Sequence, residues 1–121
     1  MSRSPNRYDP GRGWLRVKDF PNPVAASPSP APSGETGFFV LGGDDGSQVA
    51  VSPDKHRGFS RTVTRFDPKR GEWVSAGELP AARVTVPCVV WGEAWVVANG
   101  EARPGVRSPE VWRFTPPTRK P

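Results

Sequence analysis

The stretch "FDPKRGEW" (Phe66–Trp73) decides how this sequence is expected to fold. An earlier copy, "YDPGRGW" (Tyr8–Trp14), and a degraded later copy, "WRFTPPT" (Trp112–Thr118), lie on either side of it. In the two intact copies, Asp can accept a hydrogen bond from the backbone two residues on, Pro presets φ, and Gly supplies a positive φ. Each copy therefore predicts a tight turn between strands that carry aromatic residues, and the chain is expected to be a repeat.

A second element repeats in step with the first. The stretch "GFFVLGGDDG" (Gly37–Gly46) answers to "EAWVVANGEA" (Glu93–Ala102), and each is a short strand that runs into a loop containing glycine. The combined unit has four short antiparallel strands in roughly 50 residues, which is the spacing of blades in kelch propellers. The predicted fold class is all-β: a partial kelch β-propeller of about two four-stranded antiparallel blades.

The predicted strands divide the chain into parts of a propeller. A disordered N-terminus (1–7) precedes a propeller segment (8–116), and a C-terminal tail (117–121) follows it. Within the segment, residues 8–19 form the end of a blade, residues 24–76 a full blade, and residues 84–114 an incomplete blade. Because propellers close with about four to eight blades, either further blades are missing from the chain or it completes its ring by self-association. The predicted strands after the first turn are Trp14–Asp19, Val24–Ser33, Phe38–Leu41, Arg61–Phe66, Trp73–Ala76, Val84–Trp91, Ala94–Ala98 and Glu110–Phe114.

Composition narrows the classes of function. The 121 residues include 13 Gly and 16 Pro, which argue against long helices, while the Trp and Phe residues need a buried interior. The formal charge of +5 is read as a basic surface, and without a basic and aromatic strip no nucleic-acid partner is expected. No apolar run approaches the ~20 residues of a membrane span, so no membrane partner is expected. No signal peptide is visible, and the compartment stays unknown: cytoplasmic by default, periplasmic if the chain derives from a secreted parent.

Cysteine and histidine are too few for a metal centre built from side-chain nitrogen and sulfur. Such a zinc site needs about four ligands, and the chain offers only Cys88 and His56. No metal site of this kind and no internal disulfide are therefore expected, and no cofactor is expected either. Cys88 lies in the apolar stretch "VTVPCVVW" and is expected to be a small core residue rather than a nucleophile. Four Trp residues are likewise expected in the core or between blades: Trp73, Trp91, Trp95 and Trp112.

The proline-rich stretch "PVAASPSPAPSG" (Pro23–Gly34) has two interpretations. It has the composition of a linker. Alternatively it is the innermost strand of a blade, because Pro28, Pro30 and Pro32 are two residues apart and would direct their missing N–H groups to one side. That side would then be an unpaired edge along the central channel, and Pro87 in the next blade fits the same idea.

The long loops are expected on one face of the propeller. In a four-stranded meander the chain direction alternates, so the loops after the second and fourth strands emerge together. These loops are Gly42–Ser60, Gly77–Arg83 and Asn99–Pro109. Long loops positioned by a rigid sheet are where binding and catalytic residues usually lie.

One of these loops resembles a known family. "NGEARPGVRS" (Asn99–Ser108) is similar to the Asn-Gly-Glu-Ala-Lys/Arg-Pro-Gly-hydrophobic-Arg loop of the bacterial sialic acid mutarotases, also called N-acetylneuraminate epimerases. These are kelch propellers that interconvert the anomers of N-acetylneuraminate. By position, the resemblance implies that Glu101 is the proton acceptor and Arg107 a companion catalytic residue. The implied ligand is a small sugar acid like N-acetylneuraminate, and the chain alone is expected to be inactive.

The remaining candidate residues each have a structural alternative. Asn99, Arg103, Arg83 and His56 are candidates for binding substrate, since Arg can hold the carboxylate of a sugar acid with two hydrogen bonds. The alternative for the loop is a solvated turn with surface ion pairs. Arg83 could instead bond between blades, and His56 could be a lone exposed histidine. Asp44 and Asp45 are expected to form turns.

Two functions are consistent with these observations. The first is a sugar isomerase of the mutarotase type, in which one carboxylate takes and returns a proton at the anomeric centre. The second is a non-catalytic kelch module that binds a partner protein, because a propeller fold does not fix a function.

Overall fold

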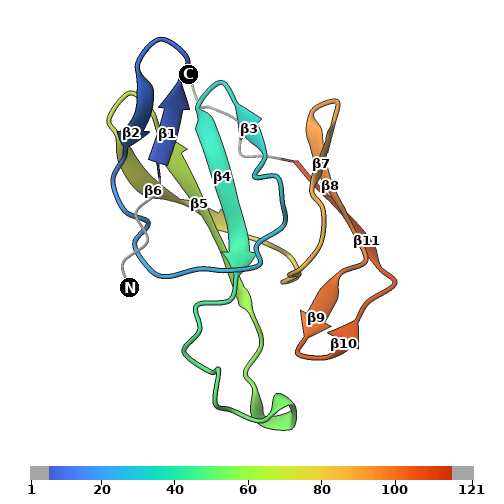
Figure 1. Ribbon diagram of the computed structural model, residues 1–121. Helices are drawn as coiled ribbons and strands as arrows, with labels where there is room; N and C mark the ends of the chain where they lie inside the picture. Colours follow the sequence, from blue (N-terminus) through green and yellow to red (C-terminus); the bar gives the residue numbers. More distant parts are fainter. Residues whose placement is uncertain (1–5, 116–121) are drawn as a thin grey trace.

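The computed structural model describes residues 6–115, and these residues form an all-β chain. A hairpin of β1 (Asn6–Asp9) and β2 (Gly13–Arg16) comes first. A four-stranded antiparallel sheet comes next, in the order β3 (Ser33–Gly34), β4 (Gly37–Gly43), β5 (Ser60–Asp67) and β6 (Glu72–Glu78). Figure 1 shows this sheet between the hairpin on its left and a second sheet on its right. A partial kelch-type propeller is therefore the fold of the chain.

The second sheet has three strands, in the order β7 (Val89–Trp91), β8 (Ala94–Ala98) and β11 (Val111–Phe114). A separate small hairpin, β9 (Glu101–Arg103) and β10 (Val106–Arg107), projects between β8 and β11. The described residues hold one short 3-10 turn, η1 (Pro53–Lys55), and no helix that could cross a membrane. Asn6 and Arg7, expected in a disordered N-terminus, belong to β1, while residues 1–5 and the expected tail at 117–121 lie outside the described residues.

The repeated Asp-Pro turns form as the sequence predicts. Asp9 Oδ1 accepts a hydrogen bond from Gly11 N at 3.0 Å, and Asp67 Oδ1 accepts one from Lys69 N at 2.9 Å. In the strands that flank each turn, Tyr8 is paired with Trp14 and Phe66 with Trp73. The same aromatic pair is therefore presented by the hairpin and by the four-stranded sheet.

The proline-rich stretch is neither a linker nor a continuous strand, so both interpretations need correction. Only its end, at β3, is regular strand, and a positive φ of 62° at Ala26 interrupts it. Ser29 N donates to Val86 O at 3.1 Å and Cys88 N donates to Ser29 O at 3.0 Å, which joins the inner segments of the two sheets. The carbonyl of Pro32 accepts Phe39 N at 2.9 Å, so this proline faces a neighbouring strand and not an open edge.

The two sheets end with the same backbone geometry. The residues that correspond in the structure differ by one position from the alignment of Gly37–Gly46 with Glu93–Ala102 in the sequence. Positive φ values occur in pairs: 61° and 102° at Gly42 and Gly43, and 69° and 88° at Asn99 and Gly100. An isolated bridge comes after each pair, between Ala25 and Asp44 in one blade and between Val84 and Glu101 in the other. Asp44 is therefore the positional equivalent of Glu101.

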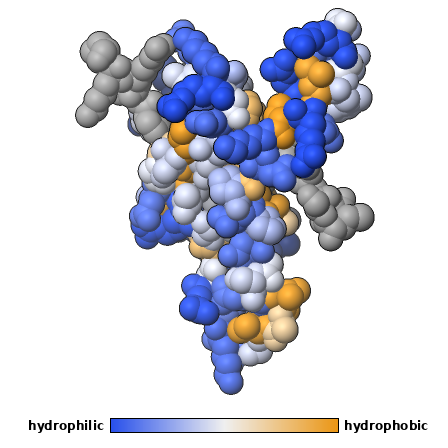
Figure 2. All heavy atoms as spheres, turned by 90° about the vertical axis from the view of Figure 1, so that its left-hand side faces the viewer, coloured by the Kyte–Doolittle hydropathy of each residue, from blue (hydrophilic) through white to orange (hydrophobic). Residues whose placement is uncertain are grey.

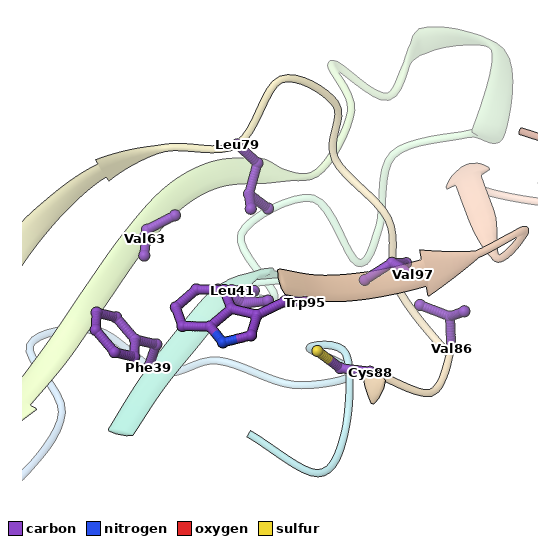
Figure 3. Packing of buried hydrophobic residues seen from close by; sticks show 8 residues of the cluster. All are labelled: Phe39, Leu41, Val63, Leu79, Val86, Cys88, Trp95 and Val97. Carbon is purple, nitrogen blue, oxygen red and sulfur yellow. The ribbon is translucent and has the colours of Figure 1, made fainter. Parts of the chain in front are cut away.

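The main core lies between the two sheets. Phe39 packs on Trp95 with ring centroids 4.6 Å apart, and Figure 3 shows Trp95 of β8 reaching toward Phe39 and Leu41 of β4. This places the fully buried Leu41 at the centre of the joint between the blades. The buried cluster consists of Phe39, Leu41, Val63, Leu79, Val86, Cys88, Trp95 and Val97.

A second, aromatic cluster covers the opposite face of the four-stranded sheet. Trp73 lies 4.9 Å from Phe20, 5.4 Å from Phe38 and 5.0 Å from Phe66 between ring centroids. Its indole N–H donates to Lys18 O at 2.8 Å. Both faces of this sheet are therefore covered by other parts of the chain. Trp91, expected in the core or between blades, packs in neither place among the described residues and is 74% exposed.

Replacing Leu41 by Ala should lower the free energy of unfolding by about 2–5 kcal/mol, because it opens a cavity in the joint between the sheets. Urea denaturation followed by tryptophan fluorescence measures the loss. Val49→Ala, at a side chain that is 89% exposed, is the control and should stay within about 0.5 kcal/mol of the parent. An equal effect of both substitutions would contradict the assigned core.

The thiol of Cys88 should make stability depend on pH. Burial raises the pKa of Cys88, so the unfolded chain loses the thiol proton first. Stability should therefore fall as the pH rises above ~8.5, the ordinary thiol pKa. Urea midpoints measured from neutral to alkaline pH for the parent and for Cys88→Ala test this, because the lost packing lowers stability at every pH while only the parent has the thiol titration. Parallel profiles would show that the thiol makes no contribution.

Candidate functional site

The loop expected to carry the site is a small hairpin. Glu101 pairs with Arg107 and Arg103 with Val106, and the register shift between these pairs leaves Ala102 as an extra residue. Pro104 and Gly105, with φ 74° at Gly105, make the connecting turn, a combination typical of type II. The sequence predicts the turn residues, but not that the loop would form its own pair of strands.

Glu101 is fixed through both its backbone and its side chain. Its N–H donates to Val84 O and its carbonyl accepts Val84 N–H, each at 3.0 Å. Its Oε2 accepts the N–H of Gly105 at 3.0 Å, across the turn of the hairpin. No hydrogen bond is formed by Oε1 among residues 6–115. One carboxylate oxygen is therefore anchored, and the other is available to accept a proton from a ligand.

Arg107 is paired with Glu101 across the hairpin, and Asn99 precedes Glu101 by two residues. The Arg107 side chain is exposed and forms no hydrogen bond or ion pair within the described part of the chain. Asn99 adopts φ 69°, donates its backbone N–H to Glu110 O at 2.8 Å, and is exposed to solvent. Both side chains are accessible to a small polar ligand.

Arg103 connects the hairpin to the long loop between β4 and β5. Its Nη2 donates to the backbone oxygen of His56. Together with the hydrogen bond from Arg83 Nη2 to Ser108 Oγ, this contact connects the three loops that the strand count placed on one face. Figure 1 shows β9 and β10 at the lower right, on the same side of the sheets as the loop that contains η1.

His56 is buried, in contrast to the exposed histidine that the sequence suggests. Its side chain is 7% exposed and its ring lies 5.2 Å from that of Phe59. The Nδ1 atom accepts the N–H of Gly58 at 2.9 Å, so the proton of the neutral ring resides on Nε2. The imidazole ring therefore stabilises the loop, and it is the backbone oxygen of His56 that accepts the hydrogen bond from Arg103.

Arg83 supports the hairpin, and within residues 6–115 its side chain bonds inside its own blade rather than between blades. It is 6% exposed, and its Nη2 donates to Glu110 Oε1 at 2.5 Å and to Ser108 Oγ at 3.1 Å. Both acceptors lie just after the hairpin, in the same blade as Arg83. The Nε atom is buried without a partner among the described residues. Ser108 and Glu110 were not predicted, since no local pattern ties them to an arginine 25 and 27 residues upstream, respectively.

The two acidic residues of the equivalent loop form turns, as predicted. Asp44 Oδ1 accepts Gly46 N at 3.0 Å. Asp45 Oδ1 accepts the hydroxyl and the N–H of Ser47, and these bonds hold the pKa of Asp45 below its ordinary value. Among residues 6–115, no three His, Cys, Asp or Glu side chains cluster in a way that could hold a metal ion.

Comparison with known proteins places the fold but not a family. No family model matches the chain, and no curated protein is significantly similar to it. A solved structure described as that of YjhT matches with a TM-score of 0.58 and 21% identity. The match covers 81% of this chain and 30% of that chain. The chain thus spans less than a third of the length of this propeller-like neighbour.

The tight contact under the hairpin predicts a sensitive position at Gly100. A Cβ atom there would lie 2.8 Å from Val86 Cβ, and φ is 88°. Gly100→Ala should therefore lose about 1–3 kcal/mol of stability beyond the ordinary cost of a positive φ. Gly105→Ala is the control, because φ is 74° there and nothing lies within 4 Å of the added atom. Urea denaturation of both variants checks the difference, and equal losses would contradict the contact.

Proposed function

We propose that this chain carries the acid–base hairpin of a kelch-type sugar isomerase that interconverts the anomers of a sugar acid like N-acetylneuraminate. The observation that carries the proposal is the pairing of Glu101 with Arg107 across β9 and β10. Residues paired on antiparallel strands have Cβ atoms about 5 Å apart and point to the same side. A carboxylate and a guanidinium are therefore neighbours on one surface of a braced hairpin.

This pair matches the needs of mutarotation. The reaction removes the proton of the anomeric hydroxyl as the bond from the anomeric carbon to the ring oxygen breaks, and the ring oxygen gains a proton. Reclosure on the other face of the carbonyl reverses these transfers and gives the other anomer. Glu101 Oε1 takes the proton of the anomeric hydroxyl and delivers it to the ring oxygen, and on reclosure it carries the proton back, while Oε2 stays bound to Gly105 N–H. Arg107 binds the carboxylate of the sugar acid with two hydrogen bonds.

Other residues on this face have supporting roles in the proposal. Asn99 offers its amide to substrate hydroxyls beside Glu101. Arg103 is held by the His56 carbonyl and forms a cationic wall next to the hairpin. Arg83 is buried against Ser108 and Glu110. In this proposal it does not bind substrate directly but holds the segment that follows Arg107.

The propeller-like fold supports this proposal, but the chain corresponds to only part of a propeller. The likeness to YjhT is to a propeller-like protein, of which this chain spans 30%. A pocket made by a whole ring has walls from every blade, so we expect substrate binding to be easier to detect in this chain than turnover.

A non-catalytic binding module is the second candidate function. It is favoured by large apolar side chains exposed on sheet surfaces, such as Trp14 and Trp91. This candidate predicts no response to a sugar acid at the hairpin, and the ligand experiment therefore separates the two functions.

Titration with N-acetylneuraminate tests the proposed isomerase. In ¹H–¹⁵N NMR spectra we expect the amide signals of Gly100, Glu101 and Arg107 to shift. Arg107→Ala should weaken binding at least about 10-fold, as for loss of a charged hydrogen bond. Exchange spectroscopy of the two anomers should show any acceleration reduced about 100-fold or more by Glu101→Gln.

Glu93→Gln is the matched control, because Glu93 is an exposed carboxylate in the β7–β8 turn of the same blade. It should leave both binding and exchange unchanged. If N-acetylneuraminate shifts no hairpin signal and does not exchange faster, the proposed activity is wrong. If exchange is accelerated and Glu101→Gln does not alter it, the assignment of the base is wrong.

A further inference from the structure

The C-terminal sheet presents an apolar face that is uncovered in the described structure. On this face Val89 is paired with Val96, Trp91 with Ala94, and Val111 with Ala98. The side chains of Val89, Trp91 and Val111 are all exposed. We call the surface formed by Val89, Trp91, Ala94, Val96, Ala98 and Val111 the C-face.

The equivalent face of the four-stranded sheet shows what kind of surface packs against the C-face. Leu41 is paired with Val63 in the first sheet, and Ala98 is paired with Val111 at the equivalent position of the second. Val63 is only 5% exposed because the second sheet covers it, whereas Val111 is 63% exposed. The same strand positions are therefore buried against a following blade in one sheet and bare in the other.

The charge on the C-face does not oppose such a contact. Arg113 lies on this face, paired with Val96, and its equivalent in the first sheet is Arg65, paired with Phe39. Arg65 is accommodated beside the internal joint, where its Nη1 donates to Thr36 O at 2.6 Å. An arginine at this position is thus compatible with a packed blade.

The opposite end of the chain presents the complementary surface. Tyr8 and Trp14 are paired on the outer side of the β1–β2 hairpin, with ring centroids 5.2 Å apart. They are equivalent to Phe66 and Trp73, whose face packs toward the segment that precedes the four-stranded sheet. Trp14 is 71% exposed. We call the surface formed by Tyr8 and Trp14 the N-face.

We infer that the C-face of one molecule binds the N-face of a second copy, head to tail, as a further blade-to-blade joint. The C-face carries the equivalents of Leu41 and Val63, and Tyr8 of the N-face is equivalent to Phe114, which packs against the internal core. The two faces lie at opposite ends of the stack of sheets (Figure 1). Such a contact joins two different patches, so it forms chains or closed rings instead of twofold dimers.

Sedimentation analysis of the full chain tests the joint. The average mass should rise with concentration above the 13.2 kDa monomer. Trp91→Asp on the C-face and Trp14→Asp on the N-face should each weaken association at least about 30-fold, as for a central tryptophan of an interface. Val49→Asp is the control, because it places the same charge on an exposed valine of the loop between β4 and β5. This loop lies at the lower end of the molecule in Figure 1, and Figure 2 shows hydrophobic spheres at that end.

Mixing the two variants gives the decisive result. Each variant alone should be monomeric, but an equimolar mixture should form a 1:1 dimer, because one member keeps an intact C-face and the other an intact N-face. Circular dichroism and urea midpoints establish that the variants are folded, and Val111→Asp and Tyr8→Asp replace either one that is not.

Three outcomes would overturn the inference. A parent chain that stays monomeric at all concentrations would show that a second copy does not occupy the faces. Continued self-association of Trp14→Asp alone would indicate a contact between like faces. An equal loss for Val49→Asp would place the contact at the loop. None of these readouts depends on the sugar acid, so they are independent of the proposed activity.

Discussion

Packing of Phe39 and Leu41 against Trp95 is the contact on which the rest of this chain depends. The four-stranded sheet is apolar on both faces, and a single sheet of this size cannot bury either face by itself. The second sheet covers one face through Trp95 and Val97, and the aromatic cluster around Trp73 covers the other. Hydrogen bonds between Ser29, Val86 and Cys88 then fix the two inner segments at one separation. The candidate hairpin inherits its position from this joint.

Much of the fold could be predicted because its signals are local. The turns at Asp9 and Asp67 arise from three neighbouring residue types, and the strands β4, β5, β6, β8 and β11 arise from short apolar runs beside them. The inner segments could not be predicted, because their shape comes from contacts between blades. Positive φ at Ala26 and Thr85, which are not residues that favour it, is imposed by the bridges on either side.

Some features of the candidate site could be predicted from the sequence and others could not. Gly100, Pro104 and Gly105 indicate sharp turns, so the shape of the hairpin was within reach of the sequence. The burial of His56 and the bond from Arg103 to its carbonyl were not, since they join residues 47 positions apart. Arg83 looked equally suited to binding an anion or bracing a loop, and only its contacts with Ser108 and Glu110 distinguish the two.

The equivalence of Asp44 and Glu101 has a consequence for how such a chain can change over time. Both residues leave the sheet through the same pair of positive φ values and the same bridge to an inner segment. The segments beyond them differ completely: a long loop with a 3-10 turn after Asp44, and a compact hairpin after Glu101. Each sheet therefore ends with the same backbone geometry, and segments of unequal length can follow it without changing the packing of the sheets. The residues of this segment can therefore change in one repeat, while the corresponding segments of other repeats serve only to connect strands.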